Sequence, residues 1–196
     1  MTRILGLTGS IGMGKSTTAG FFHEAGIPVW DADAEVHRLY APGGAAVMPL
    51  TRLCPAALKA GGVDRAVLKD WIAADPTALT QIESVVHPLV AAARQGFIDE
   101  HMRAKTPLIL LDIPLLFESG ADQLCDFTLT VSAPPEVQRA RVLDRPGMTE
   151  AHFQTILAKQ MPDKEKRARA THVIETHTPE QTRNEVLRLI AEMTES

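Results

Sequence analysis

One octapeptide near the N-terminus constrains the fold more than any other segment. Residues 9–16 read GSIGMGKS and fit the pattern G-x-x-x-x-G-K-S/T without a mismatch. Glycines let the backbone curl so that its N–H groups point at phosphate oxygens, and a helix starting there adds the positive end of its dipole. A strand-like run, Ile4 to Thr8, precedes the octapeptide, and a helical run, Lys15 to Ala25, follows it. This context predicts a phosphate-binding loop; the alternative is a glycine-rich turn with an incidental lysine.

The residue types in this loop suit a nucleoside triphosphate with its metal ion. The Lys15 ammonium can reach the β- and γ-phosphates, and the Ser16 hydroxyl can ligate Mg²⁺. We therefore expect ATP and Mg²⁺ as cofactors and count Lys15 among the catalytic residues. The residues expected to bind the nucleotide are Gly9, Ser10, Ile11, Gly12, Met13, Gly14, Lys15, Ser16 and Thr17.

Apolar runs alternate with helical segments along much of the chain. The runs that read as further strands are residues 27–30, 108–113, 127–131 and 173–174. The segments that read as further helices are residues 136–143, 150–159 and 180–193. Continuous apolar strands separated by helices indicate a parallel sheet covered on both faces, so we predict an α/β three-layer sandwich of the P-loop NTPase type with about five parallel strands.

Two stretches interrupt this alternation. Residues 33–105 read as helices and loops with no convincing strand, and Pro88 is expected to kink or end a long helix over 82–102. Residues 144–169 are polar and rich in Arg and Lys. The predicted domains are a nucleotide-binding core of residues 1–32, 106–143 and 170–196, a helical acceptor domain of residues 33–105, and a lid of residues 144–169.

Composition argues against several classes of partner. The 196 residues carry a formal net charge of −4, which gives no bulk attraction to nucleic acid or anionic membrane. No run approaches the ~18 apolar residues of a membrane span, and the N-terminus lacks the features of a signal peptide. Cys54 and Cys125 lie far apart without metal-type spacing, which favours free thiols over a disulfide. We expect a cytoplasmic monomer or small homo-oligomer acting on a small molecule.

A pair of carboxylates follows the second expected strand. Asp31 and Asp33 lie just beyond its carboxyl end, where α/β sheets bind their ligands. A carboxylate there can accept the proton of an attacking hydroxyl and align that oxygen with the γ-phosphate. Asp33 is the predicted base. The alternative is that one of these residues caps the next helix.

The remaining motifs favour a kinase over other nucleotide-binding proteins. No N-K-x-D tetrapeptide occurs, and the D-x-x-G match at residues 144–147 follows a helix rather than a strand, which weakens a GTPase interpretation. The helical insertion suits a bulky acceptor. A kinase for another small alcohol or nucleotide, and a regulatory nucleotide-binding protein without turnover, are the rival interpretations.

Several segments together resemble one family, the dephospho-CoA kinases, over nearly the whole chain. These segments are LTGSIGMGKST (7–17), GIPVWDAD (26–33), VHP (86–88), DIPLLFE (112–118), SAPPEVQRARVLDR (132–145) and KQMPDKEKRARA (159–170). The resemblance implies transfer of the γ-phosphoryl group of ATP to the ribose 3′-hydroxyl of dephospho-CoA, the last step of CoA biosynthesis. It also implies that the helical insertion is a CoA domain and that the Arg-rich insertion is a lid.

The resemblance assigns further site residues. Asp33 matches the base, and Arg141 and Arg145 match lid arginines that would share one helical face if their helix runs that far; a solvated face is the alternative. The residues assigned to the acceptor are Asp33, His37, Arg38, His87, Leu116 and Glu118.

Some of these assignments stay open. His87 either contacts the acceptor or has a structural role. Glu118 either orders Mg²⁺-bound water or orders a loop. Asp112 could serve as a Walker-B-like carboxylate, and the resemblance supports Glu118 more than Asp112. Lys164 and Arg167 either help the lid to close or are solvated.

The sequence also departs from the family pattern in two places. The family has an arginine four residues after the second aspartate of the DAD segment, where this chain has His37, with Arg38 next to it and about 100° further around a helix. Near the last strand, residues 173–176 read VIET instead of VIDN. The choice between His37 and Arg38 and the adenine contacts therefore stay open.

Overall fold

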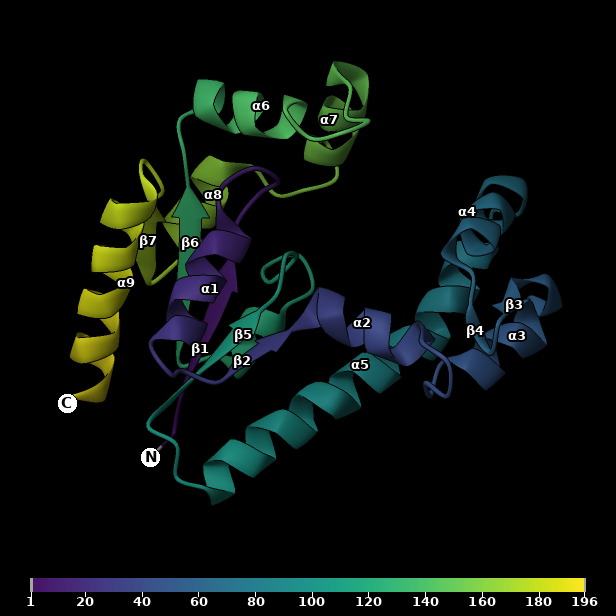
Figure 1. Ribbon diagram of the computed structural model, residues 1–196, viewed down its shortest axis with the longest axis horizontal. Coiled ribbons are helices and arrows are strands. Elements are labelled where there is room, and N and C mark those ends of the chain that lie inside the picture. The colour runs from purple at the N-terminus through teal and green to yellow at the C-terminus, as the bar shows by residue number, and fades with distance from the viewer. Residues whose placement is uncertain (1, 196) are drawn as a thin grey trace. The chain divides into compact units, whose positions relative to one another are not determined.

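The computed structural model describes residues 2–195 and divides into two compact units. One unit contains residues 1–30 and 101–196, and the other contains residues 31–100. Figure 1 shows the elements of both units, which are described separately below.

The first unit is built on a five-stranded sheet with the order β2-β5-β1-β6-β7. These strands are β1 (Arg3–Thr8), β2 (Val29–Asp31), β5 (Leu108–Asp112), β6 (Phe127–Ser132) and β7 (His172–Glu175). β1 runs parallel to both β5 and β6, with Leu5 opposite Leu110 on one side and Phe127 on the other. The predicted fold class and the number of strands are confirmed.

Helices cover both faces of this sheet, because successive side chains of a strand point to opposite faces. The covering helices are α1 (Lys15–Glu24) and α9 (Pro179–Thr194) on one face and α8 (Asp163–Arg169) on the other; α6 (Pro135–Leu143) and α7 (Glu150–Leu157) follow β6 in the chain. Leu7 and Val131 face the apolar core that α1 and α9 complete. The intervening Thr8 and Thr130 face α8, where both lie near Lys166.

The second unit contains mostly helices. They are α2 (Ala32–Tyr40), α3 (Val47–Leu53), α4 (Arg65–Ala74) and most of α5 (Ala78–Arg103), with a 3₁₀ turn, η1 (Pro55–Ala57). A second apolar core holds them together; its fully or nearly buried members include Leu39, Leu50, Leu68, Ile82 and Val86.

One expectation for this region was wrong, and another was met only in part. The prediction of no strand fails, because β3 (Leu58–Lys59) and β4 (Gly62–Val63) pair as an antiparallel hairpin. Ala60 and Gly61 join them with φ of 49° and 81°, the backbone of a tight two-residue hairpin turn. Of the two effects expected of Pro88, ending the helix does not occur, since α5 continues through it to Arg103, and a kink there stays a prediction. Val86 and Leu89 beside the proline pack into the second core, which supports the helix there.

The remaining expectations about the chain concern thiols and membranes. Cys54 and Cys125 are free, as predicted. Within residues 2–195, every helix is too short or too polar to cross a lipid bilayer.

The middle of the sheet should dominate the stability of the first unit. Leu110 on β5 is fully buried in the core, so Leu110→Ala should lower the free energy of unfolding by about 2–5 kcal/mol in urea titrations. Leu187→Ala on α9, where the leucine is 46% exposed, is the matched control and should cost much less. Equal losses in both variants would contradict the placement of β5 at the centre of the core.

Candidate nucleotide-binding site

The phosphate loop connects β1 to α1 at the carboxyl end of the sheet. Gly14 is the N-cap of α1 with φ of 86°, and Gly12 has φ of 79°. Both values lie in the left-handed region that glycine adopts without strain. This curvature turns backbone N–H groups toward the space in front of α1, where the helix dipole favours an anion.

Close packing explains why Gly12 has no side chain. A Cβ at this position would lie 2.5 Å from a methyl carbon of Val142 and 3.0 Å from the backbone oxygen of Gln138. Both neighbours belong to α6. The loop therefore rests directly on α6, and its shape depends on that helix.

Two glutamines hold Ile11 of the loop from both sides. The Gln138 side-chain amide donates to the Ile11 carbonyl oxygen at 2.7 Å. The Ile11 N–H donates to the side-chain oxygen of Gln160 at 3.0 Å. Sequence analysis did not single out either glutamine, although both lie inside the segments of family resemblance. They also line a pocket of about 380 Å³ that extends from Ser10 to the segment between α7 and α8.

The loop lysine is paired with a buried carboxylate. The Lys15 ammonium lies 2.6 Å from Oδ1 of Asp112, whose side chain is 3% exposed. Asp112 ends β5, the parallel neighbour of β1, so both strands deliver their last residues to the same edge of the sheet. Ser16 and Thr17 are exposed in the first turn of α1.

These oxygen donors fit a magnesium ion. Mg²⁺ in kinases is usually held by one or two protein oxygens together with phosphates of the substrate. The Ser16 hydroxyl is accessible, and the Asp112 carboxylate lies beside Lys15. Asp112 is thus the carboxylate that the structure places next to the loop lysine, whereas Glu118 has different partners.

Glu118 forms an ion pair with a lysine that is fully buried. Lys166 on α8 has no exposed side-chain area and lies 2.9 Å from Oε1 of Glu118. The Lys166 ammonium also contacts the Thr8 hydroxyl at 3.5 Å and the Pro114 carbonyl oxygen at 3.3 Å. Glu118 therefore compensates its charge, and neutral oxygens of Thr8 and Pro114 add hydrogen-bond acceptors.

The same carboxylate holds the segment between α7 and α8. Oε1 of Glu118 accepts a hydrogen bond of 2.8 Å from the Met161 N–H. Burial alone would raise the pKa of Glu118, but hydrogen bonds from Lys166 and Met161 outweigh it and hold the pKa below its usual value. Of the two roles considered for Glu118, ordering water on Mg²⁺ or ordering a loop, the structure shows the contact with the loop.

Leu116, assigned to the acceptor by resemblance, lies in the interior of the first unit. It is fully buried, and its methyl carbons come within 3.0–3.2 Å of where a Cβ of Gly6 would lie. Its contact with an acceptor stays a prediction.

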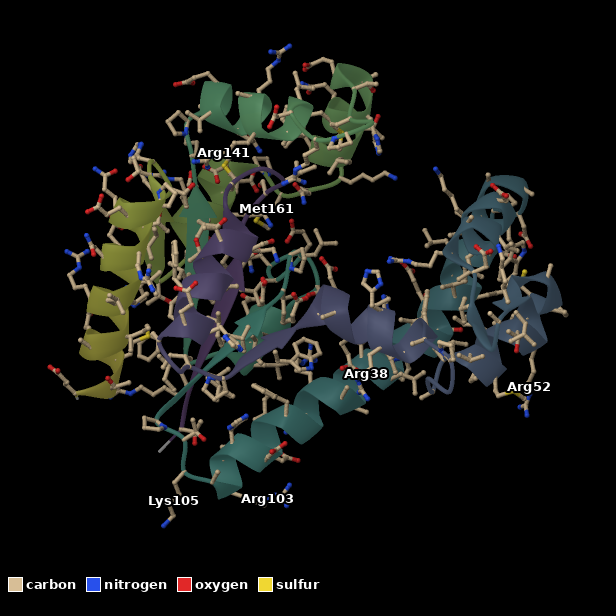
Figure 2. All side chains as sticks on the ribbon, viewed as in Figure 1. Arg38, Arg52, Arg103, Lys105, Arg141 and Met161 are labelled. Atoms are coloured by element: carbon tan, nitrogen blue, oxygen red, sulfur yellow. The ribbon has the colours of Figure 1, made fainter. Side chains whose placement is uncertain are left out.

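The two expected lid arginines have different surroundings. Arg141 on α6 donates to the hydroxyl and to the carbonyl oxygen of Thr176, at 2.9 and 2.6 Å. The Thr176 hydroxyl in turn donates to the Met13 carbonyl oxygen at 2.9 Å, which links Arg141 to the phosphate loop. Figure 2 labels Arg141 and Met161 on this unit. Thr176 follows the last strand and was not among the predicted residues.

Arg141 and Arg145 were expected to share one helical face only if their helix reached Arg145, and this condition is not met. α6 ends at Leu143, and Arg145 is exposed beyond it. The reason is Pro146, because a proline disfavours helical geometry for the residue before it. Whether Arg145 contacts the nucleotide stays a prediction.

Lys164 and Arg167, the two residues of α8 that could help a lid to close, also have different surroundings. Arg167 donates to the Ser132 hydroxyl at 3.2 Å and forms an ion pair of 2.8 Å with Glu175. Lys164 is exposed. Arg167 therefore joins α8 to the ends of β6 and β7.

Within the second unit, Asp31 and Asp33 take different roles. Oδ1 of Asp31 accepts from the N–H groups of Asp33 and Ala34, at 2.8 and 3.0 Å, and so caps α2. The capping alternative therefore applies to Asp31. The Asp33 side chain lies exposed in the first turn of the helix.

The other residues assigned to the acceptor lie on α2 and α5. Arg38 forms an ion pair of 2.6 Å with the buried Glu35 one turn earlier on α2. His37 instead lies 3.0 Å from the guanidinium of Arg65. His87 is exposed on α5.

The fold and the loop together define a class of protein. A parallel sheet with a glycine-rich loop after β1, a loop lysine and a carboxylate on the neighbouring strand are the parts of a P-loop nucleotide-binding protein.

Comparison with known proteins narrows this class to one family. A model of the dephospho-CoA kinase family matches residues 3–181. A dephospho-CoA kinase of Cereibacter sphaeroides is 63% identical over 192 residues, which cover 98% of this chain and 96% of that protein. The chain therefore belongs to the dephospho-CoA kinase family.

Two solved structures have the same fold. The crystal structure of a Thermus thermophilus protein has a TM-score of 0.82 at 37% identity and covers 97% of each chain. Dephospho-CoA kinase from Campylobacter jejuni shares the fold, with a TM-score of 0.71 at 19% identity over 100% of this chain and 99% of that one.

Removal of one partner from the buried ion pair should be costly. Glu118→Gln leaves the Lys166 ammonium without its counter-charge, which should lower the free energy of unfolding by about 3–5 kcal/mol in urea titrations. The double variant Glu118→Gln/Lys166→Met should recover most of this loss. Glu165→Gln, an exposed neighbour on α8, is the control. A cost for Glu118→Gln no larger than the control would contradict the pairing.

The same pair should make stability depend on pH in the acid range. Because the pKa of Glu118 is lowered by folding, its contribution is complete above the unfolded pKa of about 4.3 and is lost as pH falls through the lower folded pKa. The difference in unfolding free energy between wild type and Glu118→Gln should thus be constant near neutral pH and shrink below about pH 4. A difference that grew on acidification would reverse the sign of this argument.

Proposed function

We propose that the chain transfers the γ-phosphoryl group of ATP to the ribose 3′-hydroxyl of dephospho-CoA, giving CoA and ADP as the last step of CoA biosynthesis. Family membership supports the reaction. The observation that carries it in the structure is the pairing of Lys15 with Asp112 at a phosphate loop that follows β1. This arrangement places one mobile cation and one fixed carboxylate at the end of the sheet.

In this proposal the loop binds the phosphates and Ser16 with Asp112 holds Mg²⁺. When bound there, the ion would supply positive charge that neutralises the phosphates. Lys15 exchanges its contact with Asp112 for the phosphates as the nucleotide enters. Loop N–H groups other than those of Ile11 and Met13, which already donate to Gln160 and Ser10, donate to the phosphate oxygens; the curvature at Gly12 and Gly14 turns them inward.

Asp33 is the base of the proposed reaction. It is the second residue of α2, which follows β2 directly, and its carboxylate is exposed, whereas Asp31 uses its side chain as a helix cap. The Asp33 carboxylate accepts the proton of the 3′-hydroxyl while that oxygen forms a bond to the γ-phosphorus. The bond between this phosphorus and the bridging oxygen of ADP breaks in the same transfer.

The arginines and the two insertions complete the proposal. Arg141 and Arg145 supply positive charge to the phosphates, residues 33–105 bind the acceptor, and residues 144–169 form the lid. Within the lid, α8 is fixed to the sheet by the buried Lys166, so α7 carries the closing motion that excludes water. We further infer a cytoplasmic enzyme that is a monomer or a small homo-oligomer.

An acceptor-dependent assay of ADP release tests the reaction and the base together. Asp33→Asn should lower kcat by about 10²–10⁴-fold, because the amide cannot accept the proton, while calorimetry should show unchanged affinity for ATP and dephospho-CoA. Asp70→Asn, an exposed aspartate of α4, is the matched control and should keep wild-type turnover. Wild-type enzyme that releases no ADP on addition of dephospho-CoA would refute the reaction; full activity of Asp33→Asn would refute the base.

A further inference from the structure

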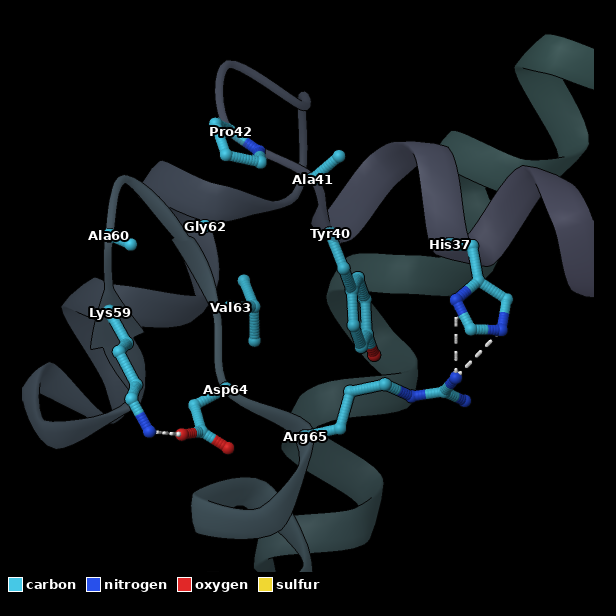
Figure 3. Close-up of a pocket in the computed structure, with 10 residues that line it drawn as sticks. All are labelled: His37, Tyr40, Ala41, Pro42, Lys59, Ala60, Gly62, Val63, Asp64 and Arg65. Atoms are coloured by element: carbon cyan, nitrogen blue, oxygen red, sulfur yellow. Dashed lines mark hydrogen bonds and ion pairs between the residues drawn. The ribbon is translucent and has the colours of Figure 1, made fainter.

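The second unit contains a pocket of about 490 Å³ formed by the end of α2, the β3–β4 hairpin and the start of α4. Figure 3 shows the side chains around it. The residues that line it are His37, Tyr40, Ala41, Pro42, Lys59, Ala60, Gly62, Val63, Asp64 and Arg65.

Most charges around this pocket are already compensated. The Lys59 ammonium lies 3.0 Å from the Asp64 carboxylate, and the pKa of Asp64 is lowered first of all by that hydrogen bond. Arg38, on the neighbouring face of α2, is bound to Glu35. These two cations therefore have carboxylate partners of their own.

Arg65 differs from both. Its guanidinium lies 5.9 Å from the centre of the Tyr40 ring and donates to Nε2 of His37 at 3.0 Å, as Figure 3 shows. Within residues 2–195, no carboxylate forms an ion pair with it. An arginine has five N–H donors and no acceptor, so this side chain retains donors for an anion.

The pocket also has a fixed relation to Asp33, because both lie on α2. Asp33 and His37 are four residues apart, which places them on the same face of the helix about 6 Å apart along its axis. Arg38 projects about 100° away from His37. A ligand that reaches from Asp33 along this face therefore meets His37 and Arg65 next.

We propose that His37 and Arg65 bind the 5′-diphosphate of the acceptor while Asp33 binds its ribose 3′-hydroxyl. The inference rests on the proposed function. In a nucleoside 5′-diphosphate derivative, one ribose separates the 3′-hydroxyl from the first phosphate, and one turn of α2 separates Asp33 from His37. The parallel N–H donors of the Arg65 guanidinium suit two phosphate oxygens, and the Tyr40 ring keeps this guanidinium in place.

This assignment makes Arg65 a specificity-determining residue. An acceptor with a 5′-diphosphate gains charge-assisted hydrogen bonds that an unphosphorylated nucleoside lacks. In this proposal His37 also orients Arg65. The guanidinium that the family usually has at position 37 is then supplied by Arg65 instead.

Steady-state kinetics and calorimetry with Arg65→Gln test the proposal. The variant should raise the KM and the Kd for dephospho-CoA by about 10–100-fold, the loss expected for charge-assisted hydrogen bonds, and leave kcat nearly unchanged. Its kcat/KM with adenosine as acceptor, which lacks the diphosphate, should equal that of wild type. Arg52→Gln on α3 removes the same charge outside the pocket and should leave every parameter unchanged.

Each other outcome overturns the proposal. The proposal fails if Arg65→Gln leaves KM and Kd for dephospho-CoA unchanged. It also fails if Arg52→Gln raises them as much as Arg65→Gln does, or if Arg65→Gln lowers kcat/KM with adenosine as much as with dephospho-CoA. If Arg65→Gln fails to fold, Arg65→Lys is the second test. This variant keeps the positive charge but loses the paired N–H donors of the guanidinium, so dephospho-CoA binding as tight as in wild type would refute the role of those donors. Wild type without dephospho-CoA-dependent ADP release would refute the proposed function, while the Kd comparison would still decide whether the pocket binds the diphosphate.

Discussion

The anchoring of the phosphate loop by later parts of the chain is the constraint on which the site depends. A loop of glycines has many accessible conformations, and fixing one of them costs conformational entropy. Here Gln138 and Gln160 hold Ile11, and Thr176 holds Met13. The loop is thus held in its binding shape by neighbours that do not occur in the motif itself.

The same neighbours connect the loop to the elements around it. Thr176 receives two hydrogen bonds from Arg141, and Gln160 precedes Met161, whose N–H is bound to Glu118. Contacts made at the loop therefore extend within the first unit to α6, to the end of β7 and to the segment that leads into α8. A change in any of these elements alters the surroundings of the phosphates without touching the motif.

Much of the fold could be predicted from sequence because its signals are local. The aliphatic run ending at Asp112 and the glycines before Lys15 identify strand, loop and helix without further information. The β3–β4 hairpin was missed because two-residue strands carry no periodicity, and the continuation of α5 through Pro88 depends on packing. The pairing of Lys15 with Asp112 rather than Glu118, the cap by Asp31 and the Arg38–Glu35 pair all required coordinates, since each depends on which of two nearby polar groups a side chain reaches.

The position of the loop anchors along the chain has a consequence for synthesis. The phosphate motif is complete once residue 16 has been made, but Gln138, Gln160 and Thr176 all lie in the last third of the chain. A nascent chain that has emerged as far as α5 already contains every residue of the second unit. The nucleotide site, although it is encoded first, is therefore among the last parts of the molecule that the ribosome allows to form.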